Sequence, residues 1–308
     1  MAADRAPALR PLGVGDVLDE LFAVYRRGFR TLIGIAAIVH IPLAIATLAF
    51  IPVFAQGSQM FGFAPNRQFD YGPMLAWTLV TLAITVPLFV IGSILELSAT
   101  CYATSALYLG ESPGILTAYR QSLGRFWPIF RLGLIFAAVV FAVQAAGFIM
   151  VVFPPLLCVS IPAAFAALIY LAVSWGLALP ALVLEDLPGA VRALGRSREL
   201  VRDAWWRTFA TLLVLGLLLS VLQLLAGGLV SALAGLLAAL IAADATTPPI
   251  WLAILNSLLG SLVNVLFAPL IYIGITLLYY DRRVRVEAYD LTLLARELEQ
   301  QRTDSAGS

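Results

Sequence analysis

The stretch TFATLLVLGLLLSVLQLLAGGLVSALAGLLAALI, residues 208–241, contains no charged residue and decides the fold. It is longer than the roughly 20 apolar residues that a helix needs to cross the hydrocarbon core of a bilayer. A soluble domain has no core large enough to cover such a helix on every side. The segment therefore predicts a transmembrane helix that tilts, bends or extends beyond the bilayer.

The rest of the chain has the same character. Of its 308 residues, 61% are hydrophobic and 12% are charged, whereas an ordinary globular chain has about 45–50% and about 25%. The mean hydropathy is +0.95. Since so little polar surface cannot coat a body in water, the composition predicts an all-α integral membrane protein and excludes a soluble one.

Apolar runs of membrane-spanning length predict six transmembrane helices. They lie at about 31–54, 74–105, 128–152, 156–182, 208–241 and 250–279. Pro87 is a candidate kink in the second run, and Gly227-Gly228 is a candidate break in the fifth. Because six crossings bring the chain back to its starting side, both termini should lie on the same face.

The arginine residues indicate which face that is. All 19 basic residues are arginine, and all except Arg67 flank the runs on the side of the termini. The positive-inside rule assigns that side to the cytoplasm. Together with the alanine-rich composition, this predicts a bacterial cytoplasmic-membrane protein with both termini in the cytoplasm.

The six runs suggest a threefold repeat within a single polytopic domain covering 1–308. Each unit, at about 12–109, 112–185 and 188–281, combines an amphipathic interfacial helix with a helical hairpin. In the first unit, apolar residues from Val14 to Tyr25 recur at 3- and 4-residue steps. Ser112-Pro113 resembles the start of the second amphipathic helix. The three hairpins would be parallel, and a cytoplasmic tail helix would follow at 284–300.

Two ionisable residues lie inside the predicted hydrocarbon layer, where such groups are costly and often functional. His40 and Glu96 are each about nine residues, or roughly 13 Å, from the cytoplasmic end of their spans. We expect them to face each other or to share a water molecule. The pair is either a proton- or cation-linked site of a transporter or a structural pair that sets the register of the hairpin.

Amide side chains are also predicted at membrane depth. They are Gln144, Gln223, Asn256 and Asn264. We expect them to form hydrogen bonds across helix contacts, although they could instead line a ligand cavity. Two stripes of mostly small residues at four-residue steps predict close helix contacts. One is Gly227, Ser231 and Gly235, and the other is Gly260, Asn264 and Ala268.

A charged shelf is predicted at the cytoplasmic end, from Arg196, Arg198 and Arg202 before the fifth span and Asp281, Arg283, Arg285 and Glu287 after the sixth. Asp281 with Arg285, and Arg283 with Glu287, have the i,i+4 spacing of helical ion pairs. The shelf is interpreted as an ion-pair contact between the tail helix and the third amphipathic segment. Alternatives are a site for anionic phospholipid headgroups and a docking surface for another protein.

Three stretches resemble a known family. They are PLGVGDVLDELFAVYRRGFRTL at 11–32, LPALVLEDLPGAVRALGRSRELVRDAWWRTF at 179–209 and APLIYIGITLLYYDRRVRVEAYDLTLLA at 268–295. They are similar to the glycerophosphoryl diester phosphodiesterase membrane domain family, and the last stretch is the most specific. The resemblance implies the multipass membrane part alone, because the chain has one histidine and no room for the soluble phosphodiesterase barrel that is fused to this domain in some relatives.

The sequence contains no catalytic motif, and we expect neither a cofactor nor a metal. Its arginines are explained by topology, so nucleic-acid binding is not expected. The leading hypothesis is a non-enzymatic inner-membrane protein that contacts anionic headgroups or anchors a protein partner at the cytoplasmic face. The alternative is a small-molecule or lipid transporter that uses His40 and Glu96. Intramembrane cleavage of a lipid phosphodiester has the least support, because one acid–base pair is available.

Overall fold

A computed structural model describes residues 13–48, 71–149, 154–185, 187–241 and 250–287, and these residues form helices and no strand. The short helices are α1 (Val14–Arg27), α5 (Ile115–Gly124), α8 (Ala178–Leu184) and α9 (Ala190–Arg202). The long helices are α2 (Phe29–Leu48), α4 (Tyr71–Tyr108), α6 (Phe126–Ile149), α7 (Pro154–Trp175), α10 (Trp205–Ile241) and α11 (Ile250–Glu287).

Six helical segments of the described chain are long and apolar enough to cross a membrane, as the composition predicts. They are Phe29–Leu48, Ala83–Tyr108, Phe126–Val143, Ser160–Leu184, Trp205–Ile241 and Ile250–Glu287. The multipass, all-helical architecture is therefore confirmed. The first and third predicted spans also include positions 49–54 and 150–152, which lie outside the described residues.

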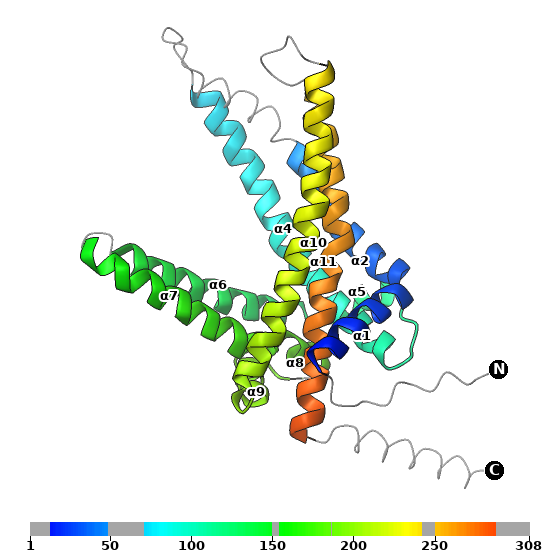
Figure 1. Cartoon of the computed structure of the whole chain (residues 1–308), viewed down its shortest axis with the longest axis vertical. Coiled ribbons are helices and arrows are strands. Elements are labelled where there is room, and N and C mark those ends of the chain that lie inside the picture. Colours follow the sequence, from blue (N-terminus) through cyan, green and yellow to red (C-terminus); the bar gives the residue numbers. More distant parts are fainter. Residues whose placement is uncertain (1–12, 49–70, 150–153, 186, 242–249, 288–308) are drawn as a thin grey trace, which may run out of the picture.

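The long helices converge at one end of the molecule and separate towards the other (Figure 1). Helices adjacent in the chain pack against each other as α2 with α4, α6 with α7, and α10 with α11. Helix α11 also packs against α1, α2 and α4, whereas the α6–α7 pair points away from the others. Helices α1, α5, α8 and α9 all lie where the six converge, and we call this the arginine-rich end.

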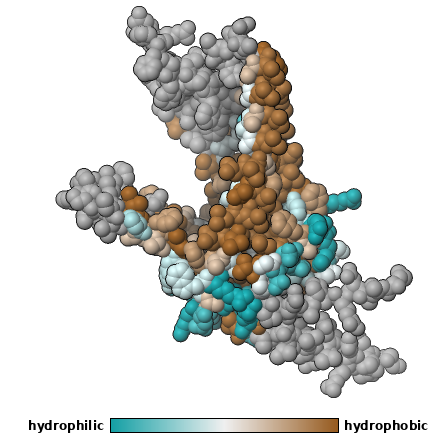
Figure 2. Space-filling model, viewed as in Figure 1, coloured by the Kyte–Doolittle hydropathy of each residue, from teal (hydrophilic) through white to brown (hydrophobic). Residues whose placement is uncertain are grey.

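The buried core is concentrated at the arginine-rich end. It combines side chains such as Leu32, Ile35, Leu215 and Ile273, all fully buried. Away from this end the helices expose large apolar side chains, for example Leu224, which is 73% exposed. Figure 2 shows the resulting apolar surface along the long helices and the hydrophilic side chains gathered near the convergence. Such a distribution suits lipid around the outer halves.

Helix α1 buries one stripe and exposes the opposite face. Val17, Leu21 and Val24 are buried at 3- and 4-residue steps, while Arg26 is exposed. Helix α1 ends at Gly28, where an added Cβ would lie 2.1 Å from Leu107 Cδ1. A glycine is therefore required for α4 to approach the junction between α1 and α2.

The predicted span at 156–182 corresponds to Ser160–Leu184, and within it the helix is interrupted after Trp175 and restarts at Ala178. Pro180 explains the interruption, since it has no N–H to donate to the carbonyl of Gly176. In the first turn of α8, where an N–H has no helical partner, proline is tolerated.

Two smaller expectations differ from the structure. Helix α10 runs without a break through Gly227-Gly228. Helix α5 begins at Ile115 rather than at Ser112-Pro113, with Gly114 at its N-cap. Pro87 lies inside helix α4, and the kink expected there stays a prediction. Of the predicted tail helix at 284–300, the structure describes only the part up to Glu287, which continues α11.

Candidate functional site

The His40–Glu96 pair lies where α2 crosses α4. Gly92 brings the two helices together, since an added Cβ there would lie 2.6 Å from Val39 Cγ1. His40 follows Val39 on α2, and Glu96 lies one turn after Gly92 on α4. Their side chains meet, and His40 Nε2 lies 3.2 Å from Glu96 Oε2. Glu96 is 2% exposed. The expectation that these two side chains face each other is therefore met.

Two more helices complete the surroundings of Glu96. Tyr119 of α5 donates a hydrogen bond of 2.7 Å to the carbonyl of Ile35, one turn before Val39. Burial, and then the negative charge of Glu96, raise the pKa of Tyr119. Tyr272 of α11 also lies within electrostatic range of Glu96. The carboxyl group is thus enclosed by α2, α4, α5 and α11.

Three oxygen atoms at Glu96 and along the next two turns of α4 have no hydrogen-bond partner among the described residues. They are Glu96 Oε1, Thr100 Oγ1 and Thr104 Oγ1. Nor is the ring N–H of His40 aligned for a hydrogen bond, although Nε2 is close to the carboxylate. A buried polar atom without a partner costs about 1–3 kcal/mol. The site therefore has capacity to bind a small polar species.

At the arginine-rich end, the centre of the charged shelf is Glu185, a residue that sequence reasoning missed. Its Oε2 accepts a hydrogen bond of 2.8 Å from Arg196 Nε, and its Oε1 accepts one of 2.7 Å from the Tyr279 hydroxyl. Arg196 also pairs with Glu287, which accepts a hydrogen bond of 3.0 Å from Arg283 Nε. We call these five residues the Glu185 cluster.

The Glu185 cluster joins two of the stretches that carry the family resemblance, 179–209 and 268–295. Arg196 of α9 connects the end of α8 to the end of α11. Burial acts to lower the pKa of the Arg196 guanidinium, but its hydrogen bonds to Glu185 and Glu287 outweigh this and raise the pKa above its ordinary value. Arg196 is therefore a permanent cation between two carboxylates.

A second contact holds α11 to α9. Arg282, only 4% exposed, donates a hydrogen bond of 3.0 Å to the carbonyl of Leu200. Its neighbour Asp281 is 2% exposed and accepts a hydrogen bond of 2.8 Å from Arg285 Nε. Both i,i+4 pairs predicted in the tail, Asp281–Arg285 and Arg283–Glu287, are present.

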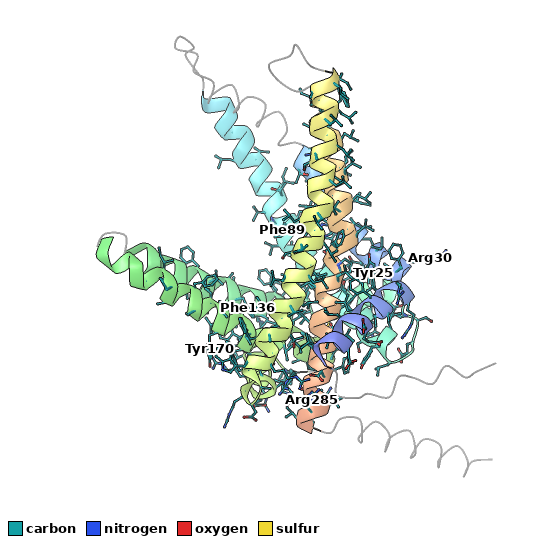
Figure 3. All side chains as sticks on the ribbon, viewed as in Figure 1. Tyr25, Arg30, Phe89, Phe136, Tyr170 and Arg285 are labelled. Carbon is teal, nitrogen blue, oxygen red and sulfur yellow. The ribbon has the colours of Figure 1, made fainter. Side chains whose placement is uncertain are left out.

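The predicted shelf residues thus divide into two groups. Arg196, Arg283 and Arg285 are committed to carboxylates. Arg198 and Arg202 are exposed on α9, where Arg198 lies over the Trp175 ring at 5.6 Å from its centroid. Figure 3 labels Arg285 near the end of α11 and Arg30 on α2. Arg202 Nε lies 3.9 Å from Asp203 Oδ1, but both of these side chains are exposed.

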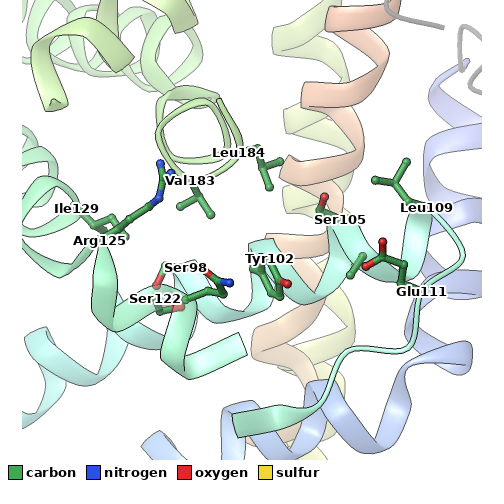
Figure 4. A pocket seen from close by; sticks show the side chains of 12 residues that line it. Ser98, Tyr102, Ser105, Leu109, Glu111, Ser122, Arg125, Ile129, Val183 and Leu184 are labelled. Atoms are coloured by element: carbon green, nitrogen blue, oxygen red, sulfur yellow. The ribbon is translucent and has the colours of Figure 1, made fainter. Parts of the chain in front are cut away.

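A cavity of about 300 Å³ lies beside α4 at the same end (Figure 4). Tyr102 lies between its two charged side chains, Arg125 on one side and Glu111 on the other. Arg125 Nη1 donates a hydrogen bond of 2.8 Å to the carbonyl of Leu182, which ties α8 to this wall. The cavity mixes hydroxyl, charged and aliphatic lining.

The predicted amide cluster is partly assembled. Gln223 Nε2 donates a hydrogen bond of 2.9 Å to Asn264 Oδ1, which joins α10 to α11. Asn256 Oδ1 has no described partner, and the side chain of Gln144 lies outside the described residues. Gln223, Asn256 and Asn264 line a cavity of about 260 Å³.

The close contacts predicted for the small-residue stripes are wrong at their glycines. Added Cβ atoms at Gly227, Gly235 and Gly260 would meet nothing within 4 Å. The amide hydrogen bond between α10 and α11 is made beside this space, so the small residues widen the groove instead of closing it.

Some site residues could have been found from the sequence. Thr100 and Thr104 follow Glu96 at four-residue steps and so share its helix face. Nothing in the sequence, however, marks Glu185, Tyr119 or Tyr272, because each meets its partner through helix packing between distant segments.

The fold defines an all-helical multipass membrane protein. No family model, curated protein or solved structure matches the chain. Its function is therefore argued from the site.

Proposed function

We propose that this chain is a non-enzymatic protein of a bacterial cytoplasmic membrane whose arginine-rich end contacts anionic phospholipid headgroups. The observation that carries the proposal is the exposure of arginines on α9 together with large apolar side chains on α9 and at the start of neighbouring long helices. Arginine binds phosphate in a planar, bidentate manner. An anionic leaflet attracts basic residues that lie near its surface.

Exposed apolar side chains at the helix ends support this placement. Val191 on α9 is 76% exposed, and Trp206 at the start of α10 is also 76% exposed. Trp127 at the start of α6 is 65% exposed. Between Val191 and Trp206 in the chain, α9 exposes three arginines, Arg192, Arg198 and Arg202. Tryptophan and arginine together suit the level of the headgroups, where rings enter lipid and guanidinium groups reach phosphate.

The Glu185 cluster has a structural role in this proposal. Its arginines are neutralised by Glu185 and Glu287, so it fixes α9 against the end of α11. The exposed face of α9 is thereby held in place for headgroup contact.

We also propose a threefold repeat and a membrane topology. The chain would consist of three parallel units, and each unit would combine one interfacial helix with a helical hairpin. The units are α1 with α2 and α4, α5 with α6 and α7, and α9 with α10 and α11, and both termini would lie in the cytoplasm. This arrangement fits the proposed resemblance to the glycerophosphoryl diester phosphodiesterase membrane domain family, of which it corresponds to the multipass membrane part. A protein partner could bind the same face.

The test compares the two groups of arginine. Purified protein is mixed with detergent-solubilised phosphatidylglycerol and phosphatidylcholine, and bound lipid is counted by native mass spectrometry. Replacing Arg192, Arg198 and Arg202 together by glutamine should reduce the preference for phosphatidylglycerol by up to about 100-fold at low salt, at about 1 kcal/mol for each arginine. Arg285→Gln is the matched control and should retain the preference. Equal lipid preference in the triple variant and the wild type would refute the proposal.

A second candidate function is transport of a lipid or small molecule past the His40–Glu96 pair. The favouring observation is the 3.2 Å contact between His40 Nε2 and Glu96 Oε2 in a buried position. The assay follows the transbilayer movement of fluorescent phosphatidylethanolamine in proteoliposomes. Movement that is absent from empty vesicles and lost in Glu96→Gln would support transport, whereas equal movement in the variant would refute a role for the pair.

A further inference from the structure

One face of α4 carries a buried polar column. Glu96, Thr100 and Thr104 recur every fourth residue and are 2%, 0% and 0% exposed. Glu96 Oε1, Thr100 Oγ1 and Thr104 Oγ1 have no hydrogen-bond partner among the described residues. A threonine inside a helix commonly donates to the carbonyl four residues earlier.

Two other buried threonines of the same protein satisfy their hydroxyls in that way. Thr211 donates to the carbonyl of Arg207 at 2.9 Å, and Thr276 donates to the carbonyl of Tyr272 at 2.7 Å. Thr100 and Thr104, like the buried Thr208 of α10, instead keep hydroxyls that remain able to donate and accept.

The polar column lies on the part of α4 that is packed against other helices at both of its ends. Gly92, one turn before Glu96, lies against Val39 of α2, and Leu107, one turn after Thr104, lies against Gly28. Since Glu96, Thr100 and Thr104 recur at four-residue steps, the column runs along α4 from Glu96 to the arginine-rich end. There Arg27 Nη1 donates a hydrogen bond of 3.3 Å to the carbonyl of Leu107.

The groups that face Glu96 from the packed helices are His40 of α2, Tyr119 of α5 and Tyr272 of α11. Of these, only the imidazole can become a cation. An ionised Glu96 beside a neutral imidazole would leave a net negative charge out of water, which is costly. One added proton makes the pair neutral, either as carboxylic acid with imidazole or as carboxylate with imidazolium.

We propose that the His40–Glu96 pair takes up and releases one proton, which travels between the pair and the arginine-rich end along Thr100 and Thr104. In the uptake step, a hydronium ion at that end becomes water and the pair gains the proton. Successive column residues are separated by about 6 Å along the helix, so a water molecule must bridge each gap while the hydroxyls accept and donate in turn.

The proposed proton site does not depend on headgroup contact. It rests on the second candidate function, because the proton would be the ion that is coupled to transport. Its test, however, uses no transported substrate. Failure of the proton test and failure of the transport assay are therefore distinguishable.

The first experiment measures whether Glu96 changes its protonation. Infrared difference spectra of the full chain in detergent are recorded between buffers of low and high pH. We expect a carboxyl band that shifts in D₂O, disappears in Glu96→Gln and moves in Glu96→Asp. Identical difference spectra for wild type and both variants would overturn the proposal. If Glu96→Gln does not fold, the Glu96→Asp comparison decides by itself.

The second experiment tests the column. After a rapid pH jump, the rate of appearance of the carboxyl band is compared for Thr100→Val, Thr104→Val and the control Thr211→Val. Each column variant removes one hydroxyl of the relay without changing the side-chain shape, so we expect about a tenfold slower rate with an unchanged final amplitude. Equal rates in all three variants would exclude this path.

Sodium ions provide the last discriminating condition. At fixed pH, replacing choline chloride by sodium chloride should leave the carboxyl band unchanged. A band that sodium alone removes would show that the site binds a metal cation and would overturn the proton form of the proposal.

Discussion

Removing the carboxylate of Glu185 should destabilise the arginine-rich end more than any exposed charge there. Glu185→Ala removes a hydrogen bond of 2.8 Å from Arg196 and one of 2.7 Å from Tyr279. Hydrogen bonds to charged groups are worth about 1.5–3 kcal/mol each. Arg196 retains Glu287, and its side chain is 19% exposed, so we expect a loss of about 2–4 kcal/mol rather than the full sum.

Thermal unfolding of the purified protein in one detergent, at one scan rate, measures this loss. Intrinsic fluorescence is suitable because two tryptophans lie at the arginine-rich end. Trp175 packs against the core cluster that includes α9, and Trp205 is the first residue of α10. A loss of 2–4 kcal/mol should lower the Tm by about 5–10 °C in a chain of this size. Glu185→Gln, which keeps an acceptor for Tyr279, should lower the Tm by less.

Glu199→Ala is the matched control. Glu199 also lies near Arg196, at 3.8 Å, but its side chain is 72% exposed, and exposed ion pairs contribute about 0–1 kcal/mol. If Glu185→Ala unfolds at the same temperature as Glu199→Ala, the reasoning that places Glu185 at the centre of the cluster is refuted. A double-mutant cycle with Arg196→Ala isolates the energy of the Glu185–Arg196 pair.

Three further variants test contacts between the long helices, each read from the Tm in detergent. Gly92→Leu should separate α2 from α4, because even a Cβ would lie 2.6 Å from Val39 Cγ1. The free energy of unfolding should fall by about 1–3 kcal/mol. Gly133→Leu is the control and should be tolerated, because the space beside Gly133 is open. Gln223→Leu should lose about 0.6–2 kcal/mol with its hydrogen bond between α10 and α11, and unchanged stability would contradict a role for this amide. Arg282→Gln should lose about 1.5–3 kcal/mol, because the carbonyl of Leu200 loses its charged donor, and a Tm equal to that of the wild type would show that this contact is dispensable.

Sequence reasoning succeeded where the relevant property is local. The apolar runs predict six membrane-length helices because burial in lipid is a property of each segment. The i,i+4 spacing predicts the Asp281–Arg285 pair because both residues lie on one helix. Even the contact of His40 with Glu96 follows locally, since two adjacent helices of one hairpin bring residues of equal depth together.

The intramembrane site shows where local reasoning ends. The four-residue steps from Glu96 to Thr104 are visible in the sequence, but their meaning depends on the burial of all three residues and on hydroxyls that have no partner among the described residues. Likewise, the small residues of α10 and α11 have the spacing of a close contact, yet the space beside Gly227 and Gly260 is open. Spacing defines a face of a helix and does not determine what packs against it.

The amino-acid sequence by itself determined that lipid surrounds much of this protein, since its apolar residues far outnumber its charged ones, and it determined where the helices run. Only the tertiary structure decided that Glu185 would gather Arg196 and Tyr279, that Arg196 would pair with Glu287 while Arg198 and Arg202 are exposed, and that α8 would separate from α7. The physical reason is that hydropathy and helical periodicity act within a segment, whereas pairing and exposure of charges depend on which distant segments converge.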